Sequence, residues 1–354
     1  MKNGLTKMKK MQNKFIDTPK NKAFFSEEFN YVFDKRDGHT AMWGKTYEDD
    51  PDVAPFNVIL DFEITERCSG IGDYGPCKFC YKSNTPNQGY VTSFEEARRI
   101  IDKLPRQCTQ IAFGTDAKLQ SNPDWYKIFT YARDSGFIPN VTVADITKET
   151  AEQLSSVCGA VAVSRYTDKN YCYDSVKRLT DCGMKQVNIH QLVSVETLDQ
   201  IYETIDDIKN DPRLAKLNAI VFLSLKRKGR GENFHSVSQE QFNDIVNKCF
   251  ELGIGFGFDS CSCKKFTNAI KDRPDGKKLM MYSEPCESTL FSFYINAKGE
   301  GFPCSFTEGT AGWETGIDVV NCNDFVSDVW HNPRIQNFRE MLLMNNRSCP
   351  IYNI

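Results

Sequence analysis

Three cysteines lie close together in the first third of the chain: Cys68, and then the pair in Cys77-Lys78-Phe79-Cys80. A Cys-x-x-Cys pair lets two sulfur atoms converge on one metal centre, and Cys68 can supply a third ligand. Iron–sulfur clusters are held by cysteine thiolates. Three local ligands would leave one iron of a cubane cluster free to bind another molecule. A catalytic zinc site keeps an open coordination position in the same way.

The same cysteines are compatible with a zinc site or with uncommitted thiols. A lone Cys-x-x-Cys pair favours zinc or redox chemistry, whereas a third cysteine in the same loop favours a cluster. The chain has 14 cysteines, and its Lys-rich first residues, Met1 to Lys22, lack the apolar stretch of a signal peptide. We therefore expect a cytoplasmic protein whose cysteines bind metal, do redox chemistry or lie buried as thiols.

A second group of cysteines lies near the end of the chain. Cys286 is followed after twelve residues by Gly299, and Gly299 after four more by Cys304. This spacing predicts two thiols at the base of a hairpin whose turn contains the glycine. Five further cysteines have no ligand spacing, and we expect them to act as small buried hydrophobic residues: Cys108, Cys158, Cys172, Cys182 and Cys249.

Composition sets limits on the partners. The chain has 354 residues, of which 40% are hydrophobic and 26% charged, with a net charge of −3, so it can bury a large core and form about two domains. A near-neutral charge gives no general attraction to nucleic acid or to an anionic membrane. No apolar run is long enough to span a bilayer. We expect no membrane partner, and nothing favours a nucleic acid.

The elements that must position these residues alternate between strand and helix from Phe56 onward. This pattern predicts βαβ units on a parallel sheet, curved or closed as a barrel, with functional groups where strands end. The cysteine loop follows the first strand. Strands are expected at residues 58–65, 110–114, 140–144, 160–164, 186–192, 219–225 and 254–258, and helices at 93–103, 123–135, 148–156, 173–182, 195–210 and 239–252.

Three regions are expected along the chain. Residues 1–55 would form a basic leader and a hairpin around Arg36-Asp37-Gly38, because Asp-Gly between apolar runs is a strong hairpin signal. Residues 56–262 would form the barrel. Residues 263–354 would form a small module with a hairpin at Ala297-Lys298-Gly299 and a helix over Pro333–Asn345.

On the cysteine loop, the sequence resembles the radical S-adenosylmethionine (SAM) enzymes. Cys68, Cys77, Cys80 and the aromatic residues Phe79 and Tyr81 carry the resemblance, which covers most of residues 56–262. The family pattern has three residues between its first two cysteines; this chain has eight, so the loop is expanded by five. The resemblance implies an α/β fold with a partial (β/α)6 TIM-type barrel and a 4Fe-4S cluster at its mouth. Reductive cleavage of SAM would then give a 5′-deoxyadenosyl radical that abstracts a substrate hydrogen.

Further positions are carried over from the family with the resemblance. Gly114-Thr115-Asp116 is a looser form of the Gly-Gly-Glu-like turn that holds the SAM amino group. The end of the fourth strand offers groups for the SAM carboxylate and ribose. For the end of the fourth strand, a helix-leading loop with incidental polarity is an equal alternative, whereas a single histidine on the fifth strand is more often structural and a basic run such as 226–231 is more often a solvated face. The implied SAM contacts are Phe79, Tyr81, Gly114, Thr115, Asp116, Ser164, Arg165, His190 and Lys226.

The C-terminal spacing resembles the opening signature of the SPASM and Twitch auxiliary-cluster domains, and so does Val329-Trp330-His331-Asn332 followed by a helix. This resemblance implies one auxiliary 4Fe-4S cluster in a Twitch-like or truncated SPASM arrangement. Its expected ligands are Cys286, Cys304, Cys349 and Cys261, with Cys263 or Cys322 as alternatives for the last position.

The resemblance implies a radical SAM oxidoreductase that oxidises or cross-links a peptide, with flavodoxin or ferredoxin as an electron donor. A radical SAM dehydrogenase of a small molecule is the alternative within the same class. From a different class, a zinc-stabilised binding protein would use the same cysteines and would be colourless.

Overall fold

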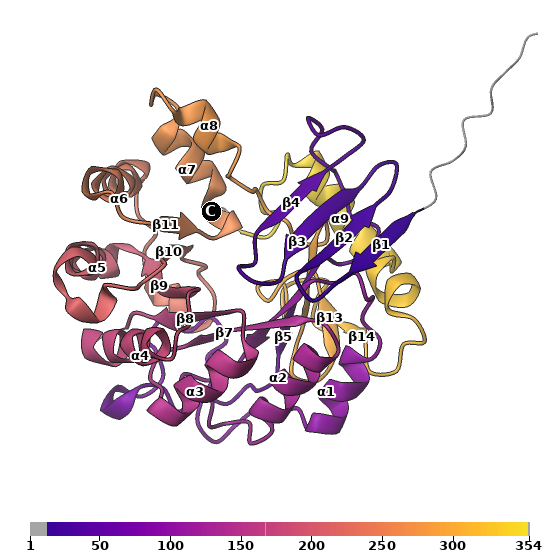
Figure 1. Cartoon of the computed structure of the whole chain (residues 1–354), viewed down its shortest axis with the longest axis horizontal. Coiled ribbons are helices and arrows are strands. Elements are labelled where there is room, and N and C mark those ends of the chain that lie inside the picture. Colours follow the sequence, from indigo (N-terminus) through magenta and orange to yellow (C-terminus); the bar gives the residue numbers. More distant parts are fainter. Residues whose placement is uncertain (1–12, 167, 353–354) are drawn as a thin grey trace, which may run out of the picture.

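The computed structural model of this chain describes residues 13–166 and 168–352. Two sheets organise these residues: a four-stranded antiparallel sheet near the N-terminus and a ten-stranded sheet that contains the barrel (Figure 1). None of the described helices is both long and apolar enough to cross a membrane.

The barrel strands pair in parallel and in chain order. Six βα units are followed by a last strand, and all seven expected strands are present. The first barrel strand, β5, pairs with β12 of the C-terminal region instead of closing onto β11, so the sheet forms a partial barrel, as predicted. The strands are β5 (Ile59–Glu63), β6 (Gln110–Gly114), β7 (Ile138–Val143), β8 (Ala160–Ser164), β9 (Val187–Val193), β10 (Ala219–Ser224) and β11 (Phe256–Phe258).

Helices cover the outer face of this sheet (Figure 1). The side chains of Leu60 and Phe62 on β5 are fully buried in the core, and the Phe113 and Phe129 rings stack with centres 4.3 Å apart. The capping box expected at Ser93 is present at the start of α1. The helices are α1 (Phe94–Ile101), α2 (Trp125–Asp134), α3 (Lys148–Val157), α4 (Lys169–Asp181), α5 (Leu198–Asn210) and α6 (Gln239–Leu252).

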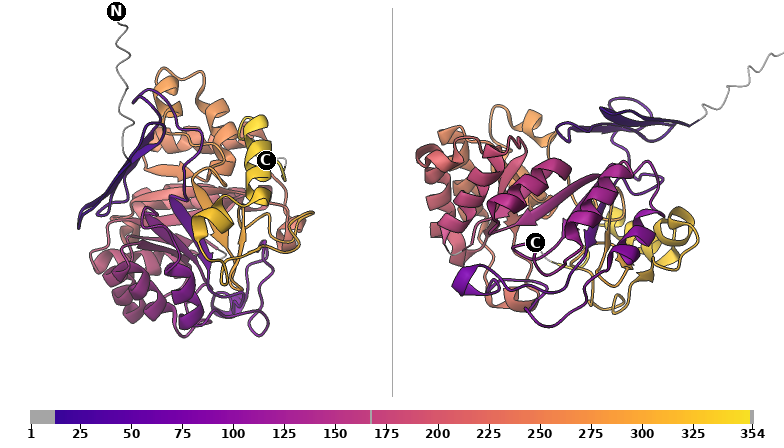
Figure 2. Two further views of the ribbon diagram at one scale, coloured as in Figure 1. Left: turned by 90° about the vertical axis from the view of Figure 1, so that its right-hand side faces the viewer. Right: turned by 60° about the horizontal axis from the view of Figure 1, so that its bottom comes forward.

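The N-terminal sheet is larger than the predicted hairpin. The hairpin is present as β3 (Asn30–Asp34) and β4 (Thr40–Trp43), but β1 (Lys14–Asp17) and β2 (Asn21–Phe25) precede it. The expected leader therefore extends no further than residue 12, and residues 1–12 lie outside the described part. Lys22 is anchored because its buried ammonium donates hydrogen bonds to the carbonyls of residues 106 and 108, and burial lowers its pKa to about 8. Figure 2 shows this sheet lying across one side of the barrel.

The C-terminal region continues the barrel sheet. Strand β12 (Ser292–Ile295) pairs in parallel with β5, and β13 (Glu300–Phe302) and β14 (Ile317–Asp318) follow it antiparallel. The turn between β12 and β13 is the one predicted at Ala297-Lys298-Gly299. The helices here are α7 (Cys263–Ile270), α8 (Gly276–Met280) and α9 (Pro333–Met344), the last of which was predicted almost to the residue. The division at residue 263 stays a prediction.

Short helical turns connect these elements. Trp330, in the last of them, is fully buried, and its indole N–H donates to the carbonyl oxygen of Ala54 at 3.1 Å. The turns are η1 (Gly72–Tyr74), η2 (Val195–Thr197), η3 (Pro212–Leu214), η4 (Gly229–Asn233), η5 (Ser260–Ser262) and the π-helical η6 (Val326–Trp330).

Candidate functional site

The loop after β5 folds back on itself and brings its cysteines together. A Cβ atom at Gly70 would lie 1.9 Å from the carbonyl carbon of Gly75, so the backbone at residue 70 is in close contact with the backbone at residue 75. Ile71 and Gly75 also form an isolated antiparallel β-bridge. The loop is thus expanded by a closed excursion over residues 70–75, which returns the chain to its starting point. This excursion explains how eight intervening residues keep Cys68 near Cys77.

The three sulfur atoms of this loop interact with one another. The Cys77 thiol donates a hydrogen bond to the Cys80 sulfur, which lowers the pKa of Cys80 and raises the pKa of Cys77. Burial raises the pKa of Cys68, and the charge of Cys80 adds to that rise. We call Cys68, Cys77 and Cys80 the loop cysteines.

Backbone N–H groups surround two of these sulfurs. Those of Lys82 and Asn84 donate to the Cys80 sulfur, and those of Gly70 and Ala117 donate to the Cys68 sulfur. Hydrogen bonds of this kind favour the thiolate form that binds metal and are the contacts that tune iron–sulfur clusters. The donor set therefore fits a cluster with three thiolate ligands.

Arg230, in η4, fastens the cysteine loop. Its Nε donates to the Cys77 carbonyl at 2.9 Å, its backbone N–H donates to the Cys80 carbonyl at 3.1 Å, and its terminal nitrogens donate to the Asn84 carbonyl at 3.2 Å. Arg230, in the basic run at 226–231, thus holds the backbone of the cysteine loop in place through hydrogen bonds. Sequence reasoning missed this role, because the run gives no signal beyond its position after a strand.

The expected SAM contacts lie at the carboxyl ends of the strands or in the loops that follow them. They differ in whether their polar atoms already have hydrogen-bond partners within the protein. Asp116 is buried, and its carboxylate already accepts hydrogen bonds from the N–H groups of Lys118, Gln120 and Ser121 at 3.1–3.3 Å. It holds its own turn in shape. The Phe79 ring lies 5.3 Å from that of Tyr166 and belongs to an apolar wall.

Arg165, after β8, carries an unmet hydrogen-bond donor. The side chain is 2% exposed, and its Nη2 pairs with the Glu203 carboxylate at 2.7 Å. Its Nε is buried with no partner among the described residues. Leaving such a donor unsatisfied costs about 1–3 kcal/mol, so the position fits an acceptor such as a carboxylate.

Two further expected contacts, His190 and Lys226, come from the second half of the barrel. His190, on β9, is next to Ser164 in the sheet register, and its Nδ1 lies 3.3 Å from the Thr142 hydroxyl. Burial lowers the pKa of His190 to about 4, so the ring is neutral at neutral pH. Lys226, after β10, is buried and pairs with Asp259. It lies beside the second group of cysteines.

Four cysteines of that second group come together from distant segments. Burial raises the pKa of Cys286 to about 12, and the nearby thiols of Cys261, Cys304 and Cys349 each add to the rise. The Lys226 ammonium and the Cys261 sulfur are hydrogen-bonded. We call these four the module cysteines. They come from η5, from the segment before β12, from the end of β13 and from the end of the described chain.

Backbone N–H groups also reach the module cysteines. Those of Phe306 and Thr307 donate to the Cys304 sulfur, and that of Tyr352 donates to the Cys349 sulfur at 3.3 Å. The two alternative ligands have other surroundings. The charged groups near the Cys263 thiol that affect its pKa are Glu284 and Arg347, not other cysteines. The Cys322 thiol donates a hydrogen bond to the Val319 carbonyl at 3.2 Å.

The other cysteines lie apart from both groups. Cys108, Cys158, Cys172 and Cys249 are buried, as expected, whereas Cys182 is half-buried. Across residues 13–166 and 168–352, no three His, Cys, Asp or Glu side chains converge as they would around a single metal ion. A cubane cluster binds one thiolate at each corner, so its ligands do not meet at one point.

A buried network of charges links the cysteine loop to the C-terminal strands. The Lys82 ammonium lies between the carboxylates of Glu63, at 3.0 Å, and Glu308. The Tyr294 hydroxyl donates to Glu63 and accepts from Lys82, both at 2.9 Å. Burial alone would lower the pKa of Lys82, but the two carboxylates outweigh it and raise the pKa. No sequence signal pointed to this network, because its members are up to 245 positions apart, from Glu63 to Glu308.

Comparisons with known proteins agree with the fold. No protein-family model and no curated protein matches the sequence. Among solved structures, SuiB of Streptococcus suis bound to precursor peptide SuiA has a TM-score of 0.66 at 12% identity, covering 89% of this chain and 90% of that one. SuiB bound to S-adenosylmethionine has the same TM-score and identity, with coverage of 92% and 90%.

This likeness establishes a shared fold: the chain has the architecture of SuiB over nearly its whole length. The α/β fold and partial barrel expected from the resemblance to radical SAM enzymes are confirmed. BtrN in complex with AdoMet and 2-DOIA also matches, but its TM-score of 0.43 at 12% identity, over 81% of this chain and 87% of that one, is too low to support an argument.

Proposed function

We propose that this chain is a radical SAM enzyme in which the loop cysteines hold a 4Fe-4S cluster with one open iron for SAM. One observation carries the proposal: three mutually interacting sulfurs, two of them receiving backbone N–H groups, lie in a self-closed loop at the carboxyl end of β5. No fourth cysteine occurs between residues 56 and 107. When bound, such a cluster supplies the electron that splits SAM into methionine and a 5′-deoxyadenosyl radical, which takes a hydrogen atom from the substrate.

The protein residues around the loop bind and orient SAM in this proposal. The unmet Nε of Arg165 offers a charge-assisted hydrogen bond to the SAM carboxylate, and Ser164 beside it offers a hydroxyl to the ribose. Asp116 holds the turn over residues 116–121, which directly follows Gly114-Thr115, in shape through its hydrogen bonds. Phe79, packed on Tyr166, excludes water from the reacting centre.

The module cysteines would hold one auxiliary 4Fe-4S cluster, with Cys261 as the fourth ligand. Support comes from the interaction of all four sulfurs and from the different surroundings of Cys263 and Cys322. Four thiolates would leave no open iron, so this cluster would carry electrons and would not bind substrate. That role suits a net two-electron oxidation, because hydrogen abstraction leaves one electron to remove from the substrate.

We infer that the substrate is a peptide that is oxidised or cross-linked. Support comes from the shared fold with SuiB, whose structure contains the precursor peptide SuiA. Flavodoxin or ferredoxin would supply the electron. The alternative of a small-molecule dehydrogenase predicts SAM cleavage that no peptide stimulates.

Anaerobic purification followed by metal analysis and a SAM-cleavage assay tests this proposal. Two 4Fe-4S clusters make a brown protein with about eight irons, and reduction in the presence of SAM should release 5′-deoxyadenosine. Replacing Cys68, Cys77 or Cys80 by Ala should abolish that release. Cys182→Ala is the matched control, because Cys182 lies in neither group. A colourless protein that contains only zinc, or full SAM cleavage by Cys77→Ala, would overturn the assignment.

A further inference from the structure

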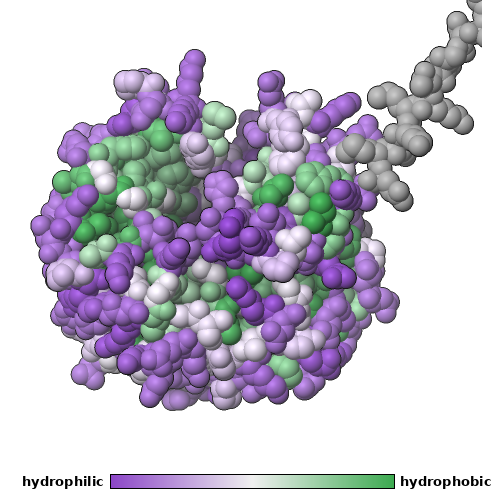
Figure 3. Space-filling model, viewed as in Figure 1, coloured by the Kyte–Doolittle hydropathy of each residue, from purple (hydrophilic) through white to green (hydrophobic). Residues whose placement is uncertain are grey.

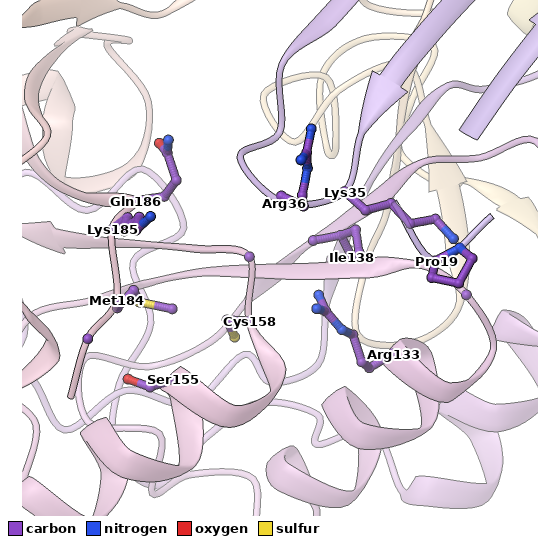
Figure 4. A pocket seen from close by; sticks show the side chains of 13 residues that line it. Pro19, Lys35, Arg36, Arg133, Ile138, Ser155, Cys158, Met184, Lys185 and Gln186 are labelled. Carbon is purple, nitrogen blue, oxygen red and sulfur yellow. The ribbon is translucent and has the colours of Figure 1, made fainter. Parts of the chain in front are cut away.

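A cavity of about 460 Å³ lies at the amino ends of β7, β8 and β9, the end of the barrel opposite the cysteine loop. Figure 4 shows its walls: Pro19, Lys35 and Arg36 from turns of the N-terminal sheet, Arg133 from the end of α2, and Lys185 from the loop before β9. The N-terminal sheet and the barrel thus form it jointly.

The cavity has an excess of positive charge. Its lining contains four basic side chains, Lys35, Arg36, Arg133 and Lys185, and no acidic one. Asp17 and Asp34 lie next to the lining and pair with Lys35 and Arg36, respectively. In the described part of the chain, Arg133 and Lys185 form no ion pair. Two positive charges therefore remain uncompensated.

One of these cations also has an unmet hydrogen-bond donor. The Nη1 atom of Arg133 is buried and has no acceptor within residues 13–166 and 168–352, and Figure 4 shows the guanidinium directed toward the cavity. A buried donor without a partner costs about 1–3 kcal/mol. An oxygen acceptor bound in the cavity would remove that cost.

A purely structural role does not account for the whole set. Arg133 is in the last turn of α2, where a cation offsets the negative end of the helix. Lys185, however, follows the end of α4 by four residues, and the helix-end role leaves Nη1 of Arg133 without an acceptor. Arg133 and Lys185 line a space that another molecule can enter.

The surroundings favour carboxylates as the ligand groups. Guanidinium groups bind carboxylates through paired hydrogen bonds. The lining has no aromatic ring on which a base could stack, and α2 and α3 end at the cavity, so no helix N-terminus is offered to a phosphate. Residues 1–12 carry four lysines and no acid, so they have the wrong sign to neutralise the cavity.

We propose that this cavity binds the carboxylate side chains of an acidic segment of the peptide substrate, at a distance from the reacting centre. This proposal rests on the proposed function. Strands of five to seven residues separate the cavity from the cysteine loop by roughly 20 Å at about 3.3 Å per residue. An extended peptide needs at least about six residues to cover that distance. The acidic segment should therefore lie at least that far from the modified residue.

The test measures binding of fluorescein-labelled hexaglutamate to the full anaerobically purified chain by fluorescence anisotropy, with hexaglutamine as the neutral control. Lys185→Glu is the main variant, because Lys185 is exposed and substitutions at exposed positions usually change stability by no more than about 0.5 kcal/mol. We expect it to weaken hexaglutamate binding at least about tenfold, the effect of 1.4 kcal/mol. Arg133→Gln should weaken binding similarly, with the melting temperature measured in parallel.

Lys277→Glu is the matched control: it makes the same charge change at an exposed position of α8, which does not line the cavity. It should leave binding unchanged. Wild-type binding should fall steeply at about 0.5 M salt, where screening shortens electrostatic reach to a few Å. Equal losses in Lys185→Glu and Lys277→Glu would overturn the proposal.

Inorganic phosphate is the competing probe. If phosphate binds as tightly as hexaglutamate, the cavity takes any small anion, and the peptide proposal is wrong. SAM cleavage without peptide, measured on the same preparations, should be the same in Lys185→Glu and wild type. The anisotropy measurement requires no turnover, so the two proposals fail in different ways. If the wild type does not cleave SAM, the proposed function is wrong; if the wild type cleaves SAM but does not bind hexaglutamate, the proposal for the cavity is wrong.

Discussion

The rings of Tyr81 and Phe306 pack at a tilt of 45° with their centres 4.5 Å apart, and each residue belongs to a segment that carries one group of cysteines. Tyr81 directly follows Cys80, and Phe306 follows Cys304 by two residues. The Ser305 side chain donates a hydrogen bond to the Tyr81 hydroxyl oxygen. The cysteine loop and the C-terminal strands therefore share one packed contact, and a disturbance of that contact should reach both segments.

Phe306→Ala should loosen this contact. Aromatic pairs contribute about 0.5–1.5 kcal/mol beyond the area they bury, and Phe306 also packs near Tyr352, three residues after Cys349. We expect a lower melting temperature and loss of iron from the module cysteines, whereas Phe306→Leu, which keeps most of the apolar volume, should retain both. Iron content and thermal unfolding measure the effect; an unchanged iron content in Phe306→Ala would contradict it.

Lys82→Met should destabilise the protein strongly. The substitution keeps an unbranched side chain of similar length but leaves the buried Glu63 and the half-buried Glu308 without their cation. Removing one partner of a buried ion pair costs about 3–5 kcal/mol. Urea unfolding should therefore show a lower midpoint for Lys82→Met than for Lys78→Met, in which the same change is made at an exposed position of the same loop. Equal midpoints would show that the network does not stabilise the loop.

The features predicted from sequence are those that depend on local patterns. The seven barrel strands are short apolar runs bounded by turns, and the loop cysteines are close in sequence, so both could be recognised. Lys82 and Glu308 are 226 positions apart, and their pairing follows from β12 adding to β5, which no periodicity encodes. Strands β1 and β2 were missed because Lys14, Lys20 and Lys22 made the segment resemble a solvated leader, whereas burial of Lys22 depends on carbonyls of residues 106 and 108.

His190 should make stability sensitive to acid. Burial lowers its pKa in the folded protein to about 4, below the ordinary value of about 6.5, so the unfolded chain takes up a proton first as pH falls. This contribution is complete above about pH 6.5 and is lost progressively down to about pH 4, by about 2 kcal/mol at pH 5. The fall in the urea midpoint from pH 7 to pH 5 should be smaller in His190→Gln than in wild type. His39→Gln, at an exposed position, should behave as wild type; if His190→Gln did so too, the buried neutral histidine would be excluded as a cause.

Gly70→Ala and Gly75→Ala form a matched pair that separates strain from collision in the cysteine loop. Both glycines have positive φ, +77° and +69°, so each alanine carries a backbone cost, and that cost is the larger at position 75, where ψ is −162° and the conformation is essentially restricted to glycine. A Cβ at position 70 would also lie 1.9 Å from the Gly75 carbonyl, whereas a Cβ at position 75 would meet nothing within 4 Å.

We therefore expect Gly70→Ala to open the excursion over residues 70–75, move Cys68 away from Cys77 and remove iron from the loop cysteines, with SAM cleavage lost. Gly75→Ala should keep both iron and cleavage. The module cysteines should retain their iron in each variant, because the excursion does not include the Tyr81 contact with Phe306. Iron analysis with electron paramagnetic resonance of the reduced protein distinguishes the two groups. If Gly70→Ala kept all its iron, closure of the excursion would not be what assembles the three sulfurs.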